Sequence, residues 1–248
     1  MNARWPYPRV IAHRGGGAHA PENTLAAIRK GKSLGFSGVE FDVMLAADLV
    51  PVLIHDETLE RTAGVAGTVA QTPSDRLAAL DAGSWFGAGF AGEPIPRYAD
   101  AVRLCRELSL WANVEIKPAP GFERDTGRIV AASSAALWRG ASIGPLLSSF
   151  SVAALEAALE AAPRLARGLL VERVAPGWRE TAERLGCVSL HCDQRHLTRE
   201  LAAEVLAAGR ALLCYTVNDP ARARELFAWG VDAIVTDRLD VVSPAEFS

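Results

Sequence analysis

A histidine and an arginine stand at the end of a short apolar run near the start of the chain. Val10-Ile11-Ala12 leads directly into His13 and Arg14, and three consecutive glycines follow at residues 15–17. The imidazole can transfer a proton near neutral pH, and the guanidinium is a fixed cation shaped for phosphate or carboxylate. Glycines after the pair let the backbone turn sharply and approach a ligand closely. The segment therefore predicts a strand that ends in a polar site.

Two carboxylates share one face of the next predicted strand, which covers residues 38–44. Side chains two apart on a strand point the same way, so Glu40 and Asp42 face one side and the apolar residues between them face the other. Adjacent buried carboxylates repel each other, and a bound cation relieves that repulsion. Oxygen ligands of this kind suit Mg²⁺ or Ca²⁺. A solvated face of an edge strand is the alternative, but the early position in a chain patterned for a buried parallel sheet favours the metal site.

Further candidates stand in two later apolar runs. His55 follows residues 49–54, and its position resembles that of His13, so the two could act as an acid/base pair. Glu115 and Lys117 lie two apart in residues 110–118 and therefore share a strand face. Glu115 could complete the metal site and Lys117 could meet a phosphate. A simple Glu-Lys surface pair is the alternative.

These residues need a fold that brings strand ends together. Apolar runs alternate with helical patterns, and we expect strands near residues 10, 39, 112, 146, 167, 188, 212 and 232. Eight such units indicate an α/β fold, a parallel (β/α)₈ TIM barrel with its site at the C-terminal ends of the strands. The run at 49–54 is then an extra extended piece after the second strand. A doubly wound open sheet is the alternative. Asn23 or Thr24 is expected to cap the first helix.

Residues 57–96 interrupt this alternation. They are rich in Ala, Gly, Thr and Asp and contain Trp85-Phe86-Gly87 and Pro94-Ile95-Pro96. We predict a small insertion with short helices, which forms a lid or wall over the site and is short for a core of its own. The whole chain, residues 1–248, is then expected to be one barrel domain.

The composition bounds the possible partners. Half of the 248 residues are hydrophobic and the formal net charge is −3, with acidic and basic residues mixed. This argues against a nucleic-acid or anionic-membrane surface, so a phosphate site must be built locally by a few cations or a metal. The four cysteines lack CxxC spacing and are predicted to be buried free thiols. The N-terminus lacks the apolar core of a signal peptide, and no run approaches the roughly 18 residues of a membrane span. We expect a cytoplasmic protein without stable membrane association.

Several segments, spread from about residue 9 to about residue 243, match one known family. They are His13-Arg14-Gly15, Pro21-Glu22-Asn23-Thr24, Gly38-Val39-Glu40-Phe41-Asp42-Val43, Ile54-His55-Asp56, the stretch 80–86, Val114-Glu115-Ile116-Lys117, Ser148-Ser149-Phe150, Thr216-Val217-Asn218 and the stretch 230–237. In number, order and spacing, these segments resemble the glycerophosphodiester phosphodiesterase family, in its cytoplasmic bacterial type.

The resemblance implies a (β/α)₈ barrel that hydrolyses glycerophosphodiesters to sn-glycerol 3-phosphate and an alcohol. It also implies one divalent metal ion, Mg²⁺ or Ca²⁺, and a small-molecule substrate. The residues that match the family's functional positions are the acid/base pair His13 and His55, the metal ligands Glu40, Asp42 and Glu115, and the phosphate contacts Arg14 and Lys117. In the family, the glycerol 2-hydroxyl is thought to be the nucleophile and to give a cyclic phosphate that water opens.

Two positions depart from the family pattern. Tyr215 stands where tryptophan is expected before Thr-Val-Asn, and Leu239 stands where proline is common. Tyr215 is predicted to contact the glycerol or the leaving group. Aromatic residues of the insertion, such as Trp85, leave a lysophospholipid-like substrate as an alternative. A non-catalytic phosphodiester-binding barrel is a further alternative, which the retention of both histidines and all three carboxylates disfavours.

The roles of several other polar residues stay open. Glu22 and Asn23 either begin a helix or line the site, and Asp56 either orients a neighbour or caps a turn. His191, at the end of a predicted strand, could reach the mouth of the barrel, and His196 lies in a polar loop. Neither of these two histidines is assigned a functional role.

Overall fold

Eight parallel strands form a closed barrel in the computed structural model, which describes residues 5–247. The strands are β1 (Val10–Ala12), β2 (Gly38–Leu45), β4 (Trp111–Ile116), β5 (Leu146–Ser149), β6 (Ala166–Val171), β7 (Ser189–Asp193), β8 (Ala211–Tyr215) and β9 (Ala233–Thr236). β1 pairs with β9 on one side and with β2 on the other, which closes the ring. The predicted TIM barrel is therefore confirmed, and the open sheet is wrong. Residues 1–4, part of the N-terminus predicted to lack a signal peptide, lie outside the described range.

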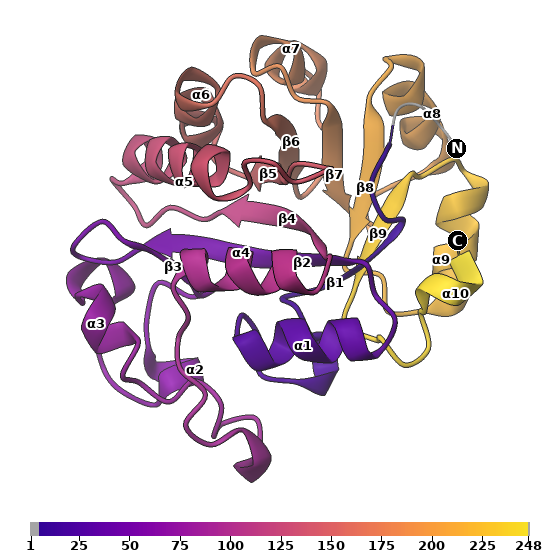
Figure 1. The fold of residues 1–248 in the computed structure, drawn as a ribbon. Coiled ribbons are helices and arrows are strands. Elements are labelled where there is room, and N and C mark those ends of the chain that lie inside the picture. Colours follow the sequence, from indigo (N-terminus) through magenta and orange to yellow (C-terminus); the bar gives the residue numbers. More distant parts are fainter. Residues whose placement is uncertain (1–4, 248) are drawn as a thin grey trace.

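Helices connect the strands and cover the outside of the barrel (Figure 1). They are α1 (Leu25–Ser33), α4 (Tyr98–Glu107), α5 (Glu123–Leu137), α6 (Val152–Ala161), α7 (Trp178–Arg184), α8 (Arg199–Ala207) and α9 (Pro220–Ala228), and α10 (Pro244–Phe247) follows β9. Of the two caps considered for α1, Thr24 is the one that forms, because its Oγ1 accepts a hydrogen bond from the Ala27 N–H at 3.1 Å. This leaves the Asn23 side chain free for another role.

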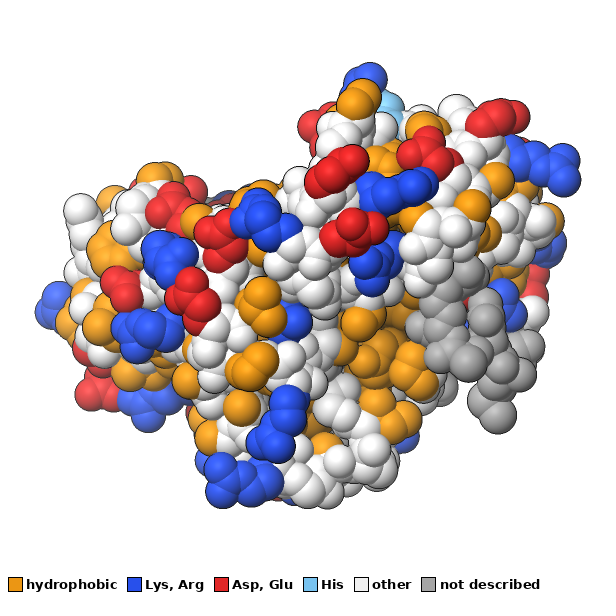
Figure 2. Space-filling view, turned by 90° about the horizontal axis from the view of Figure 1, so that it is seen from above, with side chains coloured by type: hydrophobic (Ala, Val, Ile, Leu, Met, Phe, Trp, Pro, Cys, Tyr) orange, Lys and Arg blue, Asp and Glu red, His pale blue; other side chains and the backbone are white. Residues whose placement is uncertain are grey.

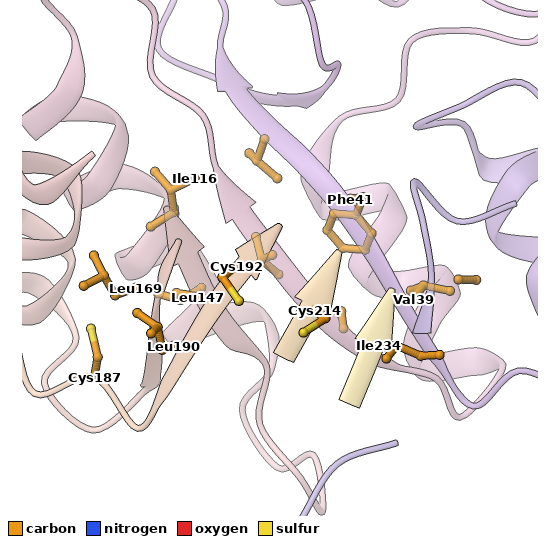
Figure 3. Packing of buried hydrophobic residues seen from close by; sticks show 14 of the residues in the cluster. Val39, Phe41, Ile116, Leu147, Leu169, Cys187, Leu190, Cys192, Cys214 and Ile234 are labelled. Atoms are coloured by element: carbon orange, nitrogen blue, oxygen red, sulfur yellow. The ribbon is translucent and has the colours of Figure 1, made fainter. Parts of the chain in front are cut away.

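The strand alternation sorts side chains between two environments. On β2, Val39, Phe41 and Val43 belong to the large apolar cluster that joins the barrel to its helices, as Figure 3 shows for Val39 and Phe41. Glu40 and Asp42 lie between them on the opposite face, toward the barrel axis. A smaller apolar cluster fills the axis itself. Its members are Trp5, Ile11, Trp111, Leu146, Ala211, Leu213, Ala233 and Val235. Polar residues near the strand ends are thus held over a packed interior.

The run at 49–54 contains β3 (Pro51–Leu53), which pairs antiparallel with β2 and lies outside the barrel. His55 therefore follows a returning strand and differs in this from His13, which follows a barrel strand. The Ile54 N–H donates to the Asp42 carbonyl at 3.2 Å. The returning strand in this way sets His55 beside the strand that carries the two carboxylates.

The insertion contains the predicted short helices. They are α2 (Glu60–Ala63), η2 (Val69–Gln71), α3 (Ser74–Leu77) and η3 (Ala88–Phe90). It packs against β2 and β3 through a small apolar cluster that includes Leu59, Val69, Leu77 and Ile95. In Figure 1 this segment lies at the lower left, beside the strands that carry the polar residues.

The expectations from composition can be compared with the described residues. All four cysteines lie in this range, and they are buried and free, as predicted. Figure 2 shows acidic and basic side chains interspersed over one face of the molecule. Among residues 5–247, no helix has both the length and the apolar character that a membrane crossing requires.

Candidate active site

Three carboxylates meet at the mouth of the barrel. Glu40 and Asp42 are on β2 and Glu115 is on β4, and the strand register places Asp42 directly opposite Glu115. Each residue has a carboxylate oxygen within 4.8 Å of the others. Glu40 and Asp42 are buried, with 4% and 1% of their surface exposed. Asn23 orients Asp42, because its Nδ2 donates to Oδ2 at 2.9 Å while its Oδ1 accepts from the Asp42 N–H at 3.0 Å.

This grouping changes the acidity of its members. Burial and the charge of Asp42 raise the pKa of Glu40 to about 7 and that of Glu115 to about 8. Burial also acts to raise the pKa of Asp42, but Lys117 and Arg14 outweigh it and leave that pKa below its ordinary value. Buried carboxylates with raised pKa values are the groups that a cation would stabilise in the charged form. The cluster could therefore hold a divalent ion through oxygen ligands.

His13 lies between two carboxylates. Its Nδ1 is 2.6 Å from Oδ1 of Asp237, and its Nε2 is 3.9 Å from Oε2 of Glu40. Asp237 follows β9 and is itself held by Asn218, whose Nδ2 donates to Oδ2 at 3.1 Å. Burial lowers the pKa of His13, but the hydrogen bond with Asp237 and the charge of Glu40 more than offset this, so the pKa is raised. The ring is therefore oriented with Nε2 toward the carboxylate cluster.

His55 has the same kind of partner but a different charge environment. Its Nδ1 is 2.6 Å from Oδ1 of the adjacent Asp56. Burial lowers the pKa of His55, and the positive charges of Arg14 and Lys117 add to this effect against the opposing charge of Asp42. The two histidines can thus hold their protons over different pH ranges, which is what an acid/base pair requires.

Two cations border the carboxylates. Lys117 Nζ is 3.5 Å from Asp42 Oδ1 and 3.6 Å from Glu115 Oε1. Arg14 Nε is 3.5 Å from Asp42 Oδ2, and among the described residues this buried nitrogen has no hydrogen-bond partner. Arg14 therefore keeps a donor available for an anion.

The backbone around Arg14 is shaped to hold it there. Arg14 and Asn23 have φ values of 48° and 58°, in the left-handed region that few non-glycine residues adopt. Gly15 has a φ of 86°, and a Cβ at this position would lie 2.9 Å from the Ile28 nitrogen. The glycine therefore allows β1 to turn directly against α1, and the turn sets Arg14 beside Asp42.

An open cavity of about 380 Å³ extends from Glu115 and Lys117, and Phe150 forms part of its wall. Tyr215 packs edge-to-face against Phe150, with ring centroids 6.0 Å apart, and its hydroxyl donates to the Val171 carbonyl at 2.8 Å. Tyr215 thus lies at the same mouth as the other predicted residues, next to a wall of this cavity.

The structure decides between several interpretations that the sequence left open. Asn23 lines the site, and Asp56 orients His55. Glu22 also belongs to the site, because its Oε1 accepts from Arg14 Nη1 at 2.7 Å. His191 is fully buried inside β7 and hydrogen-bonds Ser189, and burial lowers its pKa to about 3.

Sequence reasoning assigned no role to two residues that contact this site. Asp237 stands directly after a barrel strand, and this position is a signal that could have identified it. Arg61, in the insertion, bonds both Glu22 and Asp56. No pattern in the sequence points to it.

Comparisons with known proteins agree with this geometry. A model of the glycerophosphoryl diester phosphodiesterase family matches residues 13–241. A glycerophosphodiester phosphodiesterase of Caldanaerobacter subterraneus is 34% identical over 233 residues, which cover 92% of this chain and 93% of that protein. The solved structure of an Oleispira antarctica phosphodiesterase in complex with the product sn-glycerol-3-phosphate has a TM-score of 0.90 and 36% identity over 97% of both chains. A glycerophosphodiester phosphodiesterase of Agrobacterium tumefaciens has a TM-score of 0.78 and 28% identity, covering 94% of this chain and 98% of that one.

Proposed function

This chain belongs to the glycerophosphoryl diester phosphodiesterase family, and on that premise we propose that it hydrolyses glycerophosphodiesters to sn-glycerol 3-phosphate and an alcohol. As a member of this family, the chain is a hydrolase. The proposal is carried by one observation, the convergence of three carboxylates, two cations and two histidines at one mouth of the barrel. A phosphodiester with a divalent ion is the chemistry that such a group of charges matches.

Glu40, Asp42 and Glu115 would hold the ion, which we propose to be Mg²⁺ or Ca²⁺. Three oxygen donors within 4.8 Å of one another, two of them with raised pKa values, fit such an ion. When bound, it would offset the charge of the phosphodiester and the further charge that develops in the transition state.

The remaining residues bind the phosphate and move protons. Arg14, whose Nε makes no hydrogen bond among the described residues, and Lys117 would bind the phosphate oxygens. Of His13 and His55, one would take the proton of the nucleophile and the other would protonate the leaving alkoxide. Tyr215, beside the cavity wall, would pack against the glycerol or the leaving group.

The nucleophile is proposed to be the glycerol 2-hydroxyl, which would form a cyclic phosphate that water then opens. A glycerophosphodiester analogue that lacks this hydroxyl should then not turn over. Rapid hydrolysis of the analogue would exclude the cyclic route and leave the other assignments in place.

The test is release of sn-glycerol 3-phosphate from glycerophosphocholine and glycerophosphoethanolamine, followed with a coupled dehydrogenase. The assay is run with Mg²⁺, with Ca²⁺ and with EDTA, beside His13→Ala. We expect metal-dependent release by the wild type and almost none by the variant. Absence of release from folded wild-type protein with either metal would refute the proposal.

A lysophospholipid-like substrate is the second candidate. Phe150 is 49% exposed in the wall of the cavity that reaches Glu115 and Lys117, where it could contact an acyl chain. Choline release from lysophosphatidylcholine at a higher kcat/KM than from glycerophosphocholine would favour this candidate. The opposite order would favour the glycerophosphodiester.

A further inference from the structure

Arg61 connects the insertion to two separate parts of the site. It lies on α2, which is labelled in Figure 1. Leu59, the residue before this helix, is buried in the apolar cluster of the insertion. The guanidinium of Arg61 donates from Nε to Asp56 Oδ2 at 2.5 Å. It also donates from Nη1 and Nη2 to the two oxygens of Glu22, both at 2.7 Å. One side chain thus holds two carboxylates in a fixed relative position.

Each of these carboxylates also contacts a residue of the site. Asp56 uses its other oxygen, Oδ1, for Nδ1 of His55 at 2.6 Å. Glu22 Oε1 additionally accepts from Nη1 of Arg14 at 2.7 Å. The result is a continuous chain of hydrogen bonds from the proposed phosphate-binding arginine, through Arg61, to one proposed acid/base histidine.

The contacts of Arg61 differ from those of an ordinary surface ion pair. Exposed pairs contribute only about 0–1 kcal/mol to stability, and the Arg61 side chain is 44% exposed. The Glu22 side chain, however, is only 13% exposed, and it binds Arg61 through both oxygens. The insertion has its own apolar contacts through residues such as Leu77 and Ile95, so its attachment does not depend on this arginine.

We propose that Arg61 is a positioning residue that fixes Arg14 and His55 relative to each other, and that supplying it is a function of the insertion. The inference rests on the proposed function and extends it. Arginine suits the position because its planar fork offers donors in a fixed geometry, whereas the ammonium of lysine is a point charge. Without Arg61, Asp56 would lose the group that holds its second oxygen, and the ring of His55 would lose its fixed orientation.

The first test compares the wild-type chain with Arg61→Ala, Arg61→Lys and a matched control, Arg76→Ala. Arg76 is an exposed arginine on α3 of the same insertion. We expect Arg61→Ala to lower kcat/KM for glycerophosphocholine by about a hundredfold, which is the scale of a 1 Å misplacement in a catalytic site. Arg61→Lys should recover only part of this loss, and Arg76→Ala should match the wild type.

Two further readouts separate positioning from a general loss of structure. Guanidinium, at concentrations that leave the protein folded, should restore part of the activity of Arg61→Ala and none of that of His55→Ala. The ¹⁵N spectrum of the His55 ring should change in Arg61→Ala and stay constant in Arg76→Ala. The spectrum requires no turnover, so it tests the inference even if the wild type fails to hydrolyse glycerophosphodiesters, which would refute the proposed function alone.

Two outcomes would overturn the inference. One is a kcat/KM of Arg61→Ala within about threefold of the wild type, well short of the loss expected from misplacement. The other is a loss that guanidinium does not restore, together with an unchanged His55 spectrum. If the wild type shows no turnover, an unchanged spectrum by itself overturns it.

Discussion

Metal binding at the three-carboxylate cluster should compete directly with protons. The pKa values of Glu40 and Glu115, about 7 and about 8, lie well above that of a free glutamate, because both groups are buried beside Asp42. Below these values the metal-free protein holds protons on two of the three proposed ligands. Because an ion must displace those protons to bind, lowering the pH should weaken binding even though the fold persists.

The magnitude follows from the two pKa values. Each proton that must be displaced weakens binding about tenfold for every pH unit below the pKa of its group. Between about pH 8.5 and about pH 6 this amounts to roughly one order of magnitude for Glu40 and two for Glu115, or about 4 kcal/mol in total. Isothermal titration of Mg²⁺ and of Ca²⁺ across this range measures the affinity, and buffers of different ionisation enthalpy report the protons released.

The variant Glu115→Gln provides the control, because it removes one ligand and one titrating group. Its affinity should be lower at high pH and should depend less on pH than that of the wild type. In EDTA, the thermal stability of the wild type should fall as pH rises toward 7 and 8, because the folded state keeps protons that the unfolded chain has already released. Wild-type affinity that is independent of pH, or no binding at about pH 8.5, would refute the reasoning.

Three further predictions follow from the site and the core. His13→Ala and His55→Ala should each lower kcat by at least about a hundredfold with an unchanged circular dichroism spectrum, and near-normal turnover of either would contradict the acid/base assignment. Since the pKa of His55 is lowered and that of His13 is raised, kcat/KM should rise with pH as His55 loses its proton and should fall at higher pH as His13 loses its proton. In Asp237→Asn, which weakens the interaction that raises the pKa of His13, the falling limb of this profile should move to lower pH. A falling limb at the wild-type pH would argue against His13 as its origin. Phe41→Ala should lower the free energy of unfolding by about 3–5 kcal/mol in urea titrations, because Phe41 is fully buried between β2 and the helices, and a loss below about 1 kcal/mol would contradict that packing.

Strand periodicity explains why much of the site could be predicted. The alternation on β2 separates Glu40 and Asp42 from the apolar residues between them, and the same alternation at the end of β4 separates Glu115, and Lys117 directly after the strand, from Ile116. Recognition of a parallel barrel then brings the ends of these strands to one mouth. The pairing of β2 with β4 sets Asp42 opposite Glu115, so the three carboxylates meet through strand positions alone, whatever the loop conformations.

The residues that hold the site in place follow no such periodicity. Asp237 meets His13 across 224 positions of the chain, and Arg61 meets Glu22 across 39. Such contacts depend on how loops fold over the barrel. The direction of β3 cannot be predicted from the sequence either, because a short apolar run has the same residue pattern whether its strand pairs parallel or antiparallel. The sequence therefore places His55 at the end of an extended run, but it does not predict the antiparallel strand that sets this residue beside β2.

The two histidines lie in different charge environments within one site, and their pKa values shift in opposite directions. Each has a carboxylate 2.6 Å from Nδ1, so this partner alone does not distinguish them. The difference lies in the remaining contributions to each pKa: Nε2 of His13 faces the carboxylate of Glu40, whereas at His55 burial and the charges of Arg14 and Lys117 outweigh the charge of Asp42. A metal ion on Glu40 would offset that carboxylate's effect and leave Asp237 as the group that favours a proton on His13. We propose on this basis that His13 acts as the acid and His55 as the base, and we expect the pKa of His13 to depend on Asp237 more in the metal-loaded protein than in the metal-free protein.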